Sequence, residues 1–133
     1  MEKIGEALGL LSSICYCAAI CGFFVKKIYL AYFTKLSAED ENRKIFQRFM
    51  TFILKYHRQF GICAGVFTTV HFAWQIINVH MSYIGELAAA LMGVTVLFGI
   101  TVSLTKSRKL IRVHRIVSFS VLIVILVHVI TKL

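Results

Sequence analysis

The fold is decided by the stretch KYHRQFGICAGVFTTVH, which covers residues 55–71. It carries two histidines, His57 and His71, and apart from Lys55 and Arg58 it is uncharged and mostly apolar. Along an α-helix, the fourteen steps from the first histidine to the second rise about 21 Å and return to within about 40° of the starting direction. The stretch therefore predicts an apolar helix with two histidines on nearly one face.

A second stretch, RVHRIVSFSVLIVILVH at residues 112–128, repeats this pattern with the same spacing between His114 and His128. Ionisable side chains inside apolar helices are costly and are usually functional. Two helices that each carry two inward histidines at matching depths can hold two flat macrocycles between them, one near each face of a membrane. The repeat therefore indicates a pair of cofactor sites.

The rest of the chain is equally apolar. Of its 133 residues, 59% are hydrophobic and 16% are charged, the mean hydropathy is +0.80, and there is no proline. A soluble domain carries about 25% charged residues, whereas a membrane span takes about 17–25 apolar residues. We therefore expect one all-α, integral-membrane domain over residues 1–133, a four-helix up-down bundle with spans at about 4–25, 49–79, 87–104 and 110–130.

The basic residues predict the topology. Eight of the fifteen Lys and Arg residues fall between Lys26 and Arg58, five fall between Lys106 and Arg115, and the segment 78–86 has none. The positive-inside rule then places both basic loops in the cytoplasm and both termini outside, in a multi-pass protein of the cell membrane. These charges flank spans and accompany no recognition module, so we expect no binding to nucleic acid.

In an up-down bundle the second and fourth spans run parallel, which pairs histidines across the bundle. His57 pairs with His114 near the cytoplasmic side, and His71 pairs with His128 near the outer side. Each pair can supply the two axial nitrogens of a six-coordinate haem iron. Zinc or copper fits less well, because two histidines per ion leave its coordination shell incomplete.

Residues beside the histidines fit two haems between the second and fourth spans. Arg58 and Arg115 directly follow the inner histidines, at the depth where haem propionates need positive charge. Gly61 and Ser118, one turn further on, leave room for a porphyrin plane. We also expect Thr68 to donate a hydrogen bond to His71.

The motif His-Arg-x-x-Gly with a second histidine on one span, followed by a later span with His-Arg and an equally spaced second histidine, resembles the dihaem transmembrane cytochrome b superfamily. That superfamily includes respiratory cytochrome b and the ferric reductase-like four-helix cores, and the resemblance covers residues 46–133. It implies that His57, His71, His114 and His128 ligate haem iron. The chain departs from these relatives because it carries no recognisable quinol-site motif and no flavin or nicotinamide domain.

Together, the pattern and the resemblance predict a membrane-bound dihaem b-type cytochrome with two bis-histidine haem b groups. It is expected to carry electrons across the lipid bilayer between a cytoplasmic redox partner, a flavin or iron–sulfur protein, and a quinone or outer acceptor. Because both axial positions are filled, we favour an electron-transfer subunit over a complete enzyme. Two alternatives stay open: a stand-alone superoxide, quinone or ferric reductase acting at an exposed haem edge, and a haem-free membrane protein.

Several other residues invite a role. His80 and Glu86 could form an acceptor site at the outer face, although His80 also suits a residue at the membrane interface. Ser37 is the expected N-cap of a very long second helix, whose amphipathic foot at about 38–48 could dock a partner or simply be solvated. The four cysteines are interpreted as small apolar side chains in helix contacts.

Overall fold

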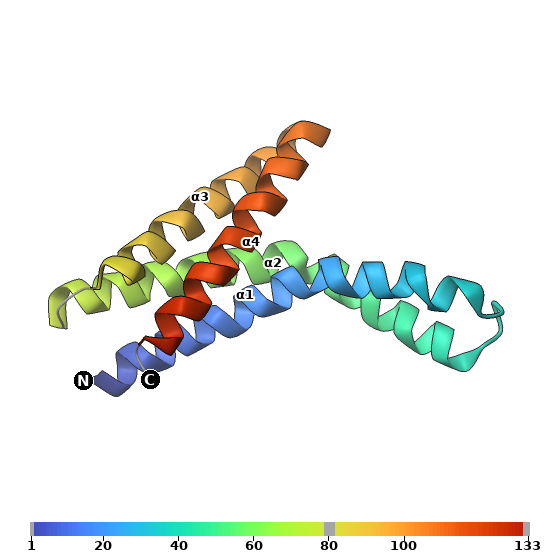
Figure 1. Cartoon of the computed structure of the whole chain (residues 1–133), viewed down its shortest axis with the longest axis horizontal. Helices are drawn as coiled ribbons and strands as arrows, with labels where there is room; N and C mark the ends of the chain where they lie inside the picture. The colour runs from blue at the N-terminus through green and yellow to red at the C-terminus, as the bar shows by residue number, and fades with distance from the viewer. Residues whose placement is uncertain (1, 79–81, 132–133) are drawn as a thin grey trace.

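The computed structural model describes residues 2–78 and 82–131. Within these ranges the chain forms four α-helices and one short 3-10 helix (Figure 1). They are α1 (Glu2–Ala31), η1 (Phe33–Lys35), α2 (Glu41–Asn78), α3 (Tyr83–Thr105) and α4 (Arg108–Ile130). The expected all-helical fold with four long helices is confirmed.

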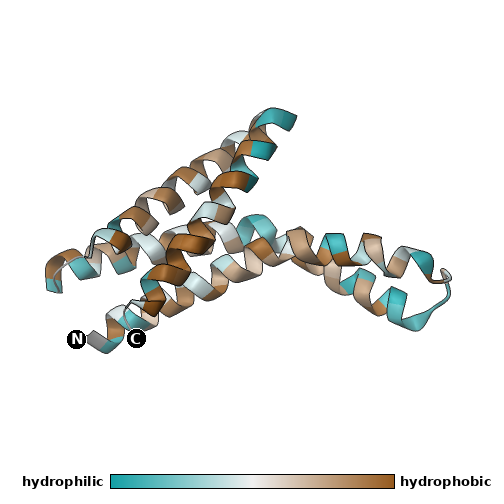
Figure 2. Cartoon of the chain, in the orientation of Figure 1, coloured by the Kyte–Doolittle hydropathy of each residue, from teal (hydrophilic) through white to brown (hydrophobic). Residues whose placement is uncertain are grey.

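All four α-helices are long and apolar enough to cross a membrane. Large apolar side chains are exposed on every one of them, for example Leu10, Phe52, Leu97 and Ile123. In Figure 2 the apolar colour dominates the middle of the helices, while hydrophilic residues gather at the α3–α4 turn and along the far end of the α1–α2 hairpin. An apolar outside with polar ends suits a lipid environment better than water.

The helices are longer than the spans predicted from hydropathy, above all α1 with its 30 residues and α2 with its 38. The expected N-cap at Ser37 is wrong. Instead, the Oδ1 atom of Asp40 accepts hydrogen bonds from the backbone N–H groups of Asn42 and Arg43, at 2.9 and 3.2 Å. The helix therefore begins at Glu41, because the carboxylate of Asp40 satisfies the N–H groups of its first turn.

The four helices form two antiparallel hairpins, α1–α2 and α3–α4, which diverge from each other at one end (Figure 1). Each hairpin packs along its length, and α2 also touches α3. In the described part of the chain, α2 and α4 make no extended contact. The molecule is thus two splayed hairpins rather than a closed bundle. The histidines of α2 and of α4 lie on opposite sides of the space between these two helices.

The hairpins meet in one tightly packed layer at mid-height, which we call the middle layer. It consists of one buried residue from each helix: Tyr16 (4% exposed), Ala64 (0%), Met92 (2%) and Val121 (0%). Ala64 is seven residues from both His57 and His71, and Val121 is seven residues from both His114 and His128. Close packing therefore separates two levels, each marked by a pair of histidines.

Hydrogen bonds reinforce the middle layer. The hydroxyl of Tyr16 on α1 donates to the carbonyl of Ser118 on α4. Ser12 Oγ donates to the carbonyl of Ala64 at 3.1 Å and lies 2.6 Å from Thr68 Oγ1. Thr68 thus bonds to α1, and the expectation that it would orient His71 is wrong.

Candidate functional site: two histidine pairs between hairpins

The orientation of His57 is set by a main-chain carbonyl of α1. Its Nδ1 atom lies 2.9 Å from the carbonyl oxygen of Ala19. Since a carbonyl can only accept, Nδ1 carries the proton, and Nε2 of the neutral ring keeps its lone pair. The bond therefore leaves His57 with Nε2 as its available metal-binding nitrogen.

His71 is held in the same way, one level further along α2. Its Nδ1 atom lies 2.8 Å from the carbonyl oxygen of Gly5. The interval from Gly5 to Ala19 equals the interval from His57 to His71, so the two carbonyls on α1 repeat with the period of the histidines on α2. A second hydrogen bond of this kind is common on metal-ligating histidines, because it fixes the tautomer and the direction of the ring.

On the other side of the molecule, glycines of α3 lie against the histidines of α4. A Cβ atom built on Gly99 would lie 3.4 Å from Cε1 of His114, and one built on Gly85 would lie 3.1 Å from Cε1 of His128. These two glycines have the same spacing as the histidines that they face. Each histidine level is therefore shaped by both α1 and α3.

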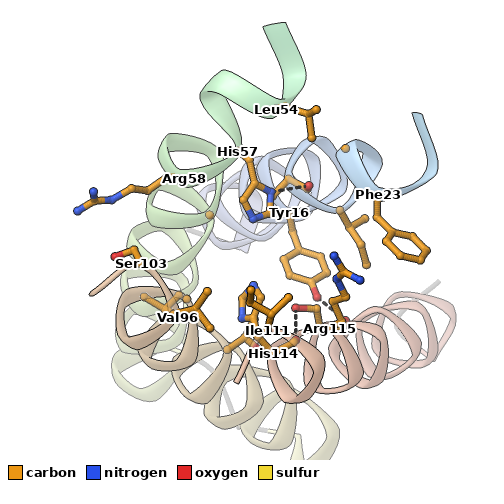
Figure 3. Close-up of a pocket in the computed structure, with 18 of the residues that line it drawn as sticks. Tyr16, Phe23, Leu54, His57, Arg58, Val96, Ser103, Ile111, His114 and Arg115 are labelled. Carbon is orange, nitrogen blue, oxygen red and sulfur yellow. Dashed lines mark hydrogen bonds between the residues drawn. The ribbon is translucent and has the colours of Figure 1, made fainter. Parts of the chain in front are cut away.

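His57 and His114 point toward one another across the space between α2 and α4 (Figure 3). Their ring centres are 6.4 Å apart, and their planes are inclined at 85°. Two metal–imidazole bonds of about 2 Å each, with roughly 1 Å from each nitrogen to its ring centre, add up to about 6 Å. The observed separation of the ring centres is close to this sum.

A cavity of about 660 Å³ surrounds these two histidines, within the size range of cofactor pockets. Gly61 and Ser118 line it, as their positions one turn from the histidines predicted. A Cβ atom on Gly61 would meet nothing within 4 Å, so this wall is open. Ser118 Oγ donates to the carbonyl of His114 at 2.7 Å and so turns back onto its own helix.

Four cationic side chains line the same cavity: Lys26, Lys27, Arg58 and Arg115. None of the described residues that line it is acidic. Lys27 and Arg115 both lie over the ring of Phe23, at 4.7 and 5.6 Å from its centre. Arg58 extends away on the opposite side of His57 (Figure 3). The two arginines predicted to act alike therefore occupy different walls.

The predicted acceptor site at the other end is only partly described. Glu86 is half-buried in the first turn of α3, next to Gly85, whose N–H donates to the N-cap Ser82 Oγ at 3.1 Å. His80 lies outside the described residues. The structure therefore places Glu86 one residue from the glycine that faces His128.

Sequence reasoning missed the contributions of α1 and α3, which carry no histidine. The signal was present as small residues that repeat with the histidine spacing: Gly5 and Ala19 in one helix, Gly85 and Gly99 in the other. Small residues in apolar helices usually indicate close helix packing. In this molecule the small residues also let the backbone of α1 or α3 lie directly against an imidazole ring.

In the described part of the chain, no group of three or more His, Cys, Asp or Glu side chains lies close enough together to bind a metal ion. A site for a bare zinc or copper ion is therefore not found among these residues, whereas a macrocycle that supplies four ligands of its own needs only two.

No protein-family model, curated protein or solved structure matches this chain.

Proposed function

We propose that this protein is a membrane-bound dihaem b-type cytochrome that carries electrons across the bilayer. His57 and His114 would ligate the inner haem, and His71 and His128 the outer haem. The observation that carries the proposal is the engagement of both Nδ1 atoms on α2 by carbonyls of α1. This arrangement presents Nε2 of each ring as a ligand at two levels about 21 Å apart.

When bound, the two haems would supply the one-electron redox chemistry. The chain itself supplies bis-histidine ligation, a surrounding of low dielectric, and positive charge at the inner site from Lys26, Lys27 and Arg115. The middle layer between the two levels holds the hairpins together and sets the spacing of the sites. The proposed acceptor at the outer face is a quinone or another outer oxidant, and the partner at the inner face is a flavin or iron–sulfur protein.

The orientation of the chain in the cell membrane is part of this proposal. The basic end of the two hairpins would face the cytoplasm, and both termini would lie outside. Moving an electron between the two levels would then be coupled to the membrane potential, at about 2.3 kcal/mol per charge per 100 mV.

The test is an absorption spectrum of the purified protein, reduced minus oxidised, with a haem count per chain. Two low-spin b-type haems are expected. Because ligands of one iron act together, His57→Ala and His114→Ala should each remove one and the same haem, and His71→Ala and His128→Ala should each remove the other.

Thr69→Ala is the matched control, because Thr69 is exposed on α2 and its hydroxyl donates only to the Gly65 carbonyl of its own helix, at 2.9 Å. It should keep both haems. Absence of haem from folded protein expressed with haem available would refute the proposal. Loss of different haems from His57→Ala and His114→Ala would refute the pairing.

A further inference from the structure

One part of the α1–α2 hairpin extends beyond the other hairpin. His57 and His114 lie side by side, so they mark one depth on α2 and α4. α4 begins at Arg108, six residues before His114, and the matching level on α2 is Thr51. α2 begins ten residues earlier, at Glu41. Measured along its own axis, α2 therefore extends about 15 Å further from the level of the histidines than α4 does.

The same reasoning applies to α1, where Ala19 marks the depth of His57. We call residues 26–50 the hairpin tip. A headgroup layer adds only about 5–8 Å to each side of the hydrocarbon core. With the start of α4 at the surface of the hydrocarbon core, the end of the hairpin tip would extend beyond the headgroup layer into water.

The hairpin tip has an aromatic core of its own. The rings of Tyr29, Phe33 and Phe46 are stacked within 13° of parallel, with centres 4.2–6.4 Å apart, and Phe49 meets Phe46 edge-on at 6.3 Å. Arg43 ties the connecting segment to α2 by donating to the carbonyl of Leu36 at 2.7 Å. These contacts show that the hairpin tip is a packed structural element rather than an irregular loop.

One face of α2 in this region combines an apolar stripe with a row of cations. Ile45, Phe49 and Phe52 follow helical spacing and are 60%, 48% and 52% exposed. Lys44, Arg48 and Lys55 run beside them at the neighbouring positions. Lys44 lies 3.1 Å from the Glu41 carboxylate, whereas Arg48 and Lys55 make no ion pair with any described residue.

This stripe descends along α2 toward the level of the inner cavity, on a different face of the helix from the residues that line the cavity. Its lower end, Phe52, contacts Tyr56 at 4.8 Å between ring centres, and His57 is the next residue. The stem of the hairpin tip also supplies Lys26, Lys27 and Leu30 to the cavity wall. A partner seated on the hairpin tip would therefore stand close to the cavity wall that these three residues form.

We propose that the hairpin tip is the docking surface for the acidic face of a water-soluble redox protein, which exchanges electrons with the inner site. The inference rests on the proposed function and names the partner by its surface. Residues 26–50 carry six Lys or Arg against three acidic residues, which favours an acidic surface and fast association. The exposed aromatic and aliphatic side chains supply the apolar centre that a protein interface needs.

The experiment measures direct binding to the full chain in phosphatidylcholine nanodiscs. The probes are a small acidic [2Fe–2S] ferredoxin and, for comparison, a basic cytochrome c of similar size. Ferredoxin should bind, and its affinity should fall with ionic strength, whereas cytochrome c should not bind. The double variant Lys44→Glu with Arg48→Glu should weaken ferredoxin binding by about tenfold or more, and Ile45→Ser by several-fold.

The matched control is Arg108→Glu with Lys109→Glu, which reverses two exposed charges at the same end of the molecule but outside the hairpin tip. Equal losses in the control and the tip variant would overturn the proposal, and so would equal binding of the two probes. Greater protection of amides 41–50 from deuterium exchange in phosphatidylserine discs without ferredoxin would show that lipid covers the surface, and would also overturn it. Because binding is read without electron transfer, failure here is distinct from absence of haem.

Discussion

At the scale of single residues, imidazole rings are oriented here by main chain rather than by other side chains. The carbonyls of Gly5 and Ala19 hold the Nδ1 atoms of His71 and His57. A carbonyl in a helix cannot rotate or be removed by substitution, so the direction of each ring is fixed by how closely α1 approaches α2. The small residues that permit this approach are therefore as important as the histidines.

Gly9→Ala tests this steric constraint. Its Cβ would lie 3.1 Å from Cε1 of His71, so the ring must move, at about 1–3 kcal/mol. We expect the absorption and electron paramagnetic resonance signals of the outer haem to change while those of the inner haem stay constant.

Gly93→Ala is the control for that variant, because its Cβ would meet nothing within 4 Å. It should leave both spectra intact and stabilise the helix by about 0.5–1 kcal/mol. Unchanged outer-haem signals in Gly9→Ala would show that the approach of α1 does not orient His71.

At the scale of helices, periodicity was sufficient to predict the four elements but not their ends. Hydropathy stops where polar residues begin, and α2 continues past that point because its first turns pack aromatic rings against α1 and η1. Ser37 and Asp40 are both good N-caps by residue type. Only the path of the connecting segment, which places the Asp40 carboxylate at 2.9 Å from the N–H of Asn42, decides between them.

The site was predictable to a similar degree. The spacing of the histidines predicted that His57 and His114 would approach each other, because a helix turns regularly, and their ring centres lie 6.4 Å apart. The pairing of His71 with His128 stays a prediction. The different walls taken by Arg58 and Arg115 could not be predicted, because long side chains reach in any direction and settle on rings such as Phe23, which comes from another helix. The predicted hydrogen bond from Thr68 to His71 was wrong for a similar reason. The hydroxyl of Thr68 pairs with Ser12, which comes from another helix, α1.

Removing the cap tests how the hairpin tip is held. Asp40→Ala should destabilise the start of α2 by about 0.5–2 kcal/mol, because two N–H groups lose their acceptor. Faster deuterium exchange at residues 42–46 is the expected readout. Asp40→Asn keeps an oxygen acceptor and should exchange nearly as slowly as the native chain; equal rates in Asp40→Ala and the native chain would contradict the assignment of the cap.

At the scale of the whole molecule, the two hairpins are joined at the middle layer and open on either side of it. Enlarging that layer should therefore disturb both sites at once. Ala64→Leu inserts a larger side chain where Ala64 has no exposed surface, and we expect a cost of about 1–3 kcal/mol with reduced occupancy of both haems.

Ala73→Leu makes the same change on α2 at an exposed position. It should retain two haems per chain by absorption. Loss of only one haem from Ala64→Leu would show that the middle layer does not couple the two levels.

The distribution of charge over the molecule predicts the order of the two potentials. Four cationic side chains line the inner cavity, whereas residues 3–9 and 82–86, near His71 and His128, contain one cation, Lys3, and two acidic residues, Glu6 and Glu86. Adding an electron is favoured beside positive charge, so the inner haem should be reduced at the higher potential.

A redox titration checks this order. His71→Ala should leave only the inner haem and His114→Ala only the outer haem, so each potential can be assigned to its haem. The double variant Lys26→Gln with Lys27→Gln should lower the potential of the inner haem and leave the outer one nearly unchanged, because the charges lie about 20 Å or more from it. A higher potential at the outer haem would contradict the electrostatic argument.

The middle layer has one more consequence. Tyr16, Ala64, Met92 and Val121 leave almost no surface accessible to water between the two levels. Electrons can tunnel through packed side chains, whereas sodium ions need a hydrated route and protons need water or a continuous chain of hydrogen bonds. In the proposed dihaem protein, this layer would let electrons pass between two compartments. It would at the same time block the flow of ions down the gradient that separates them.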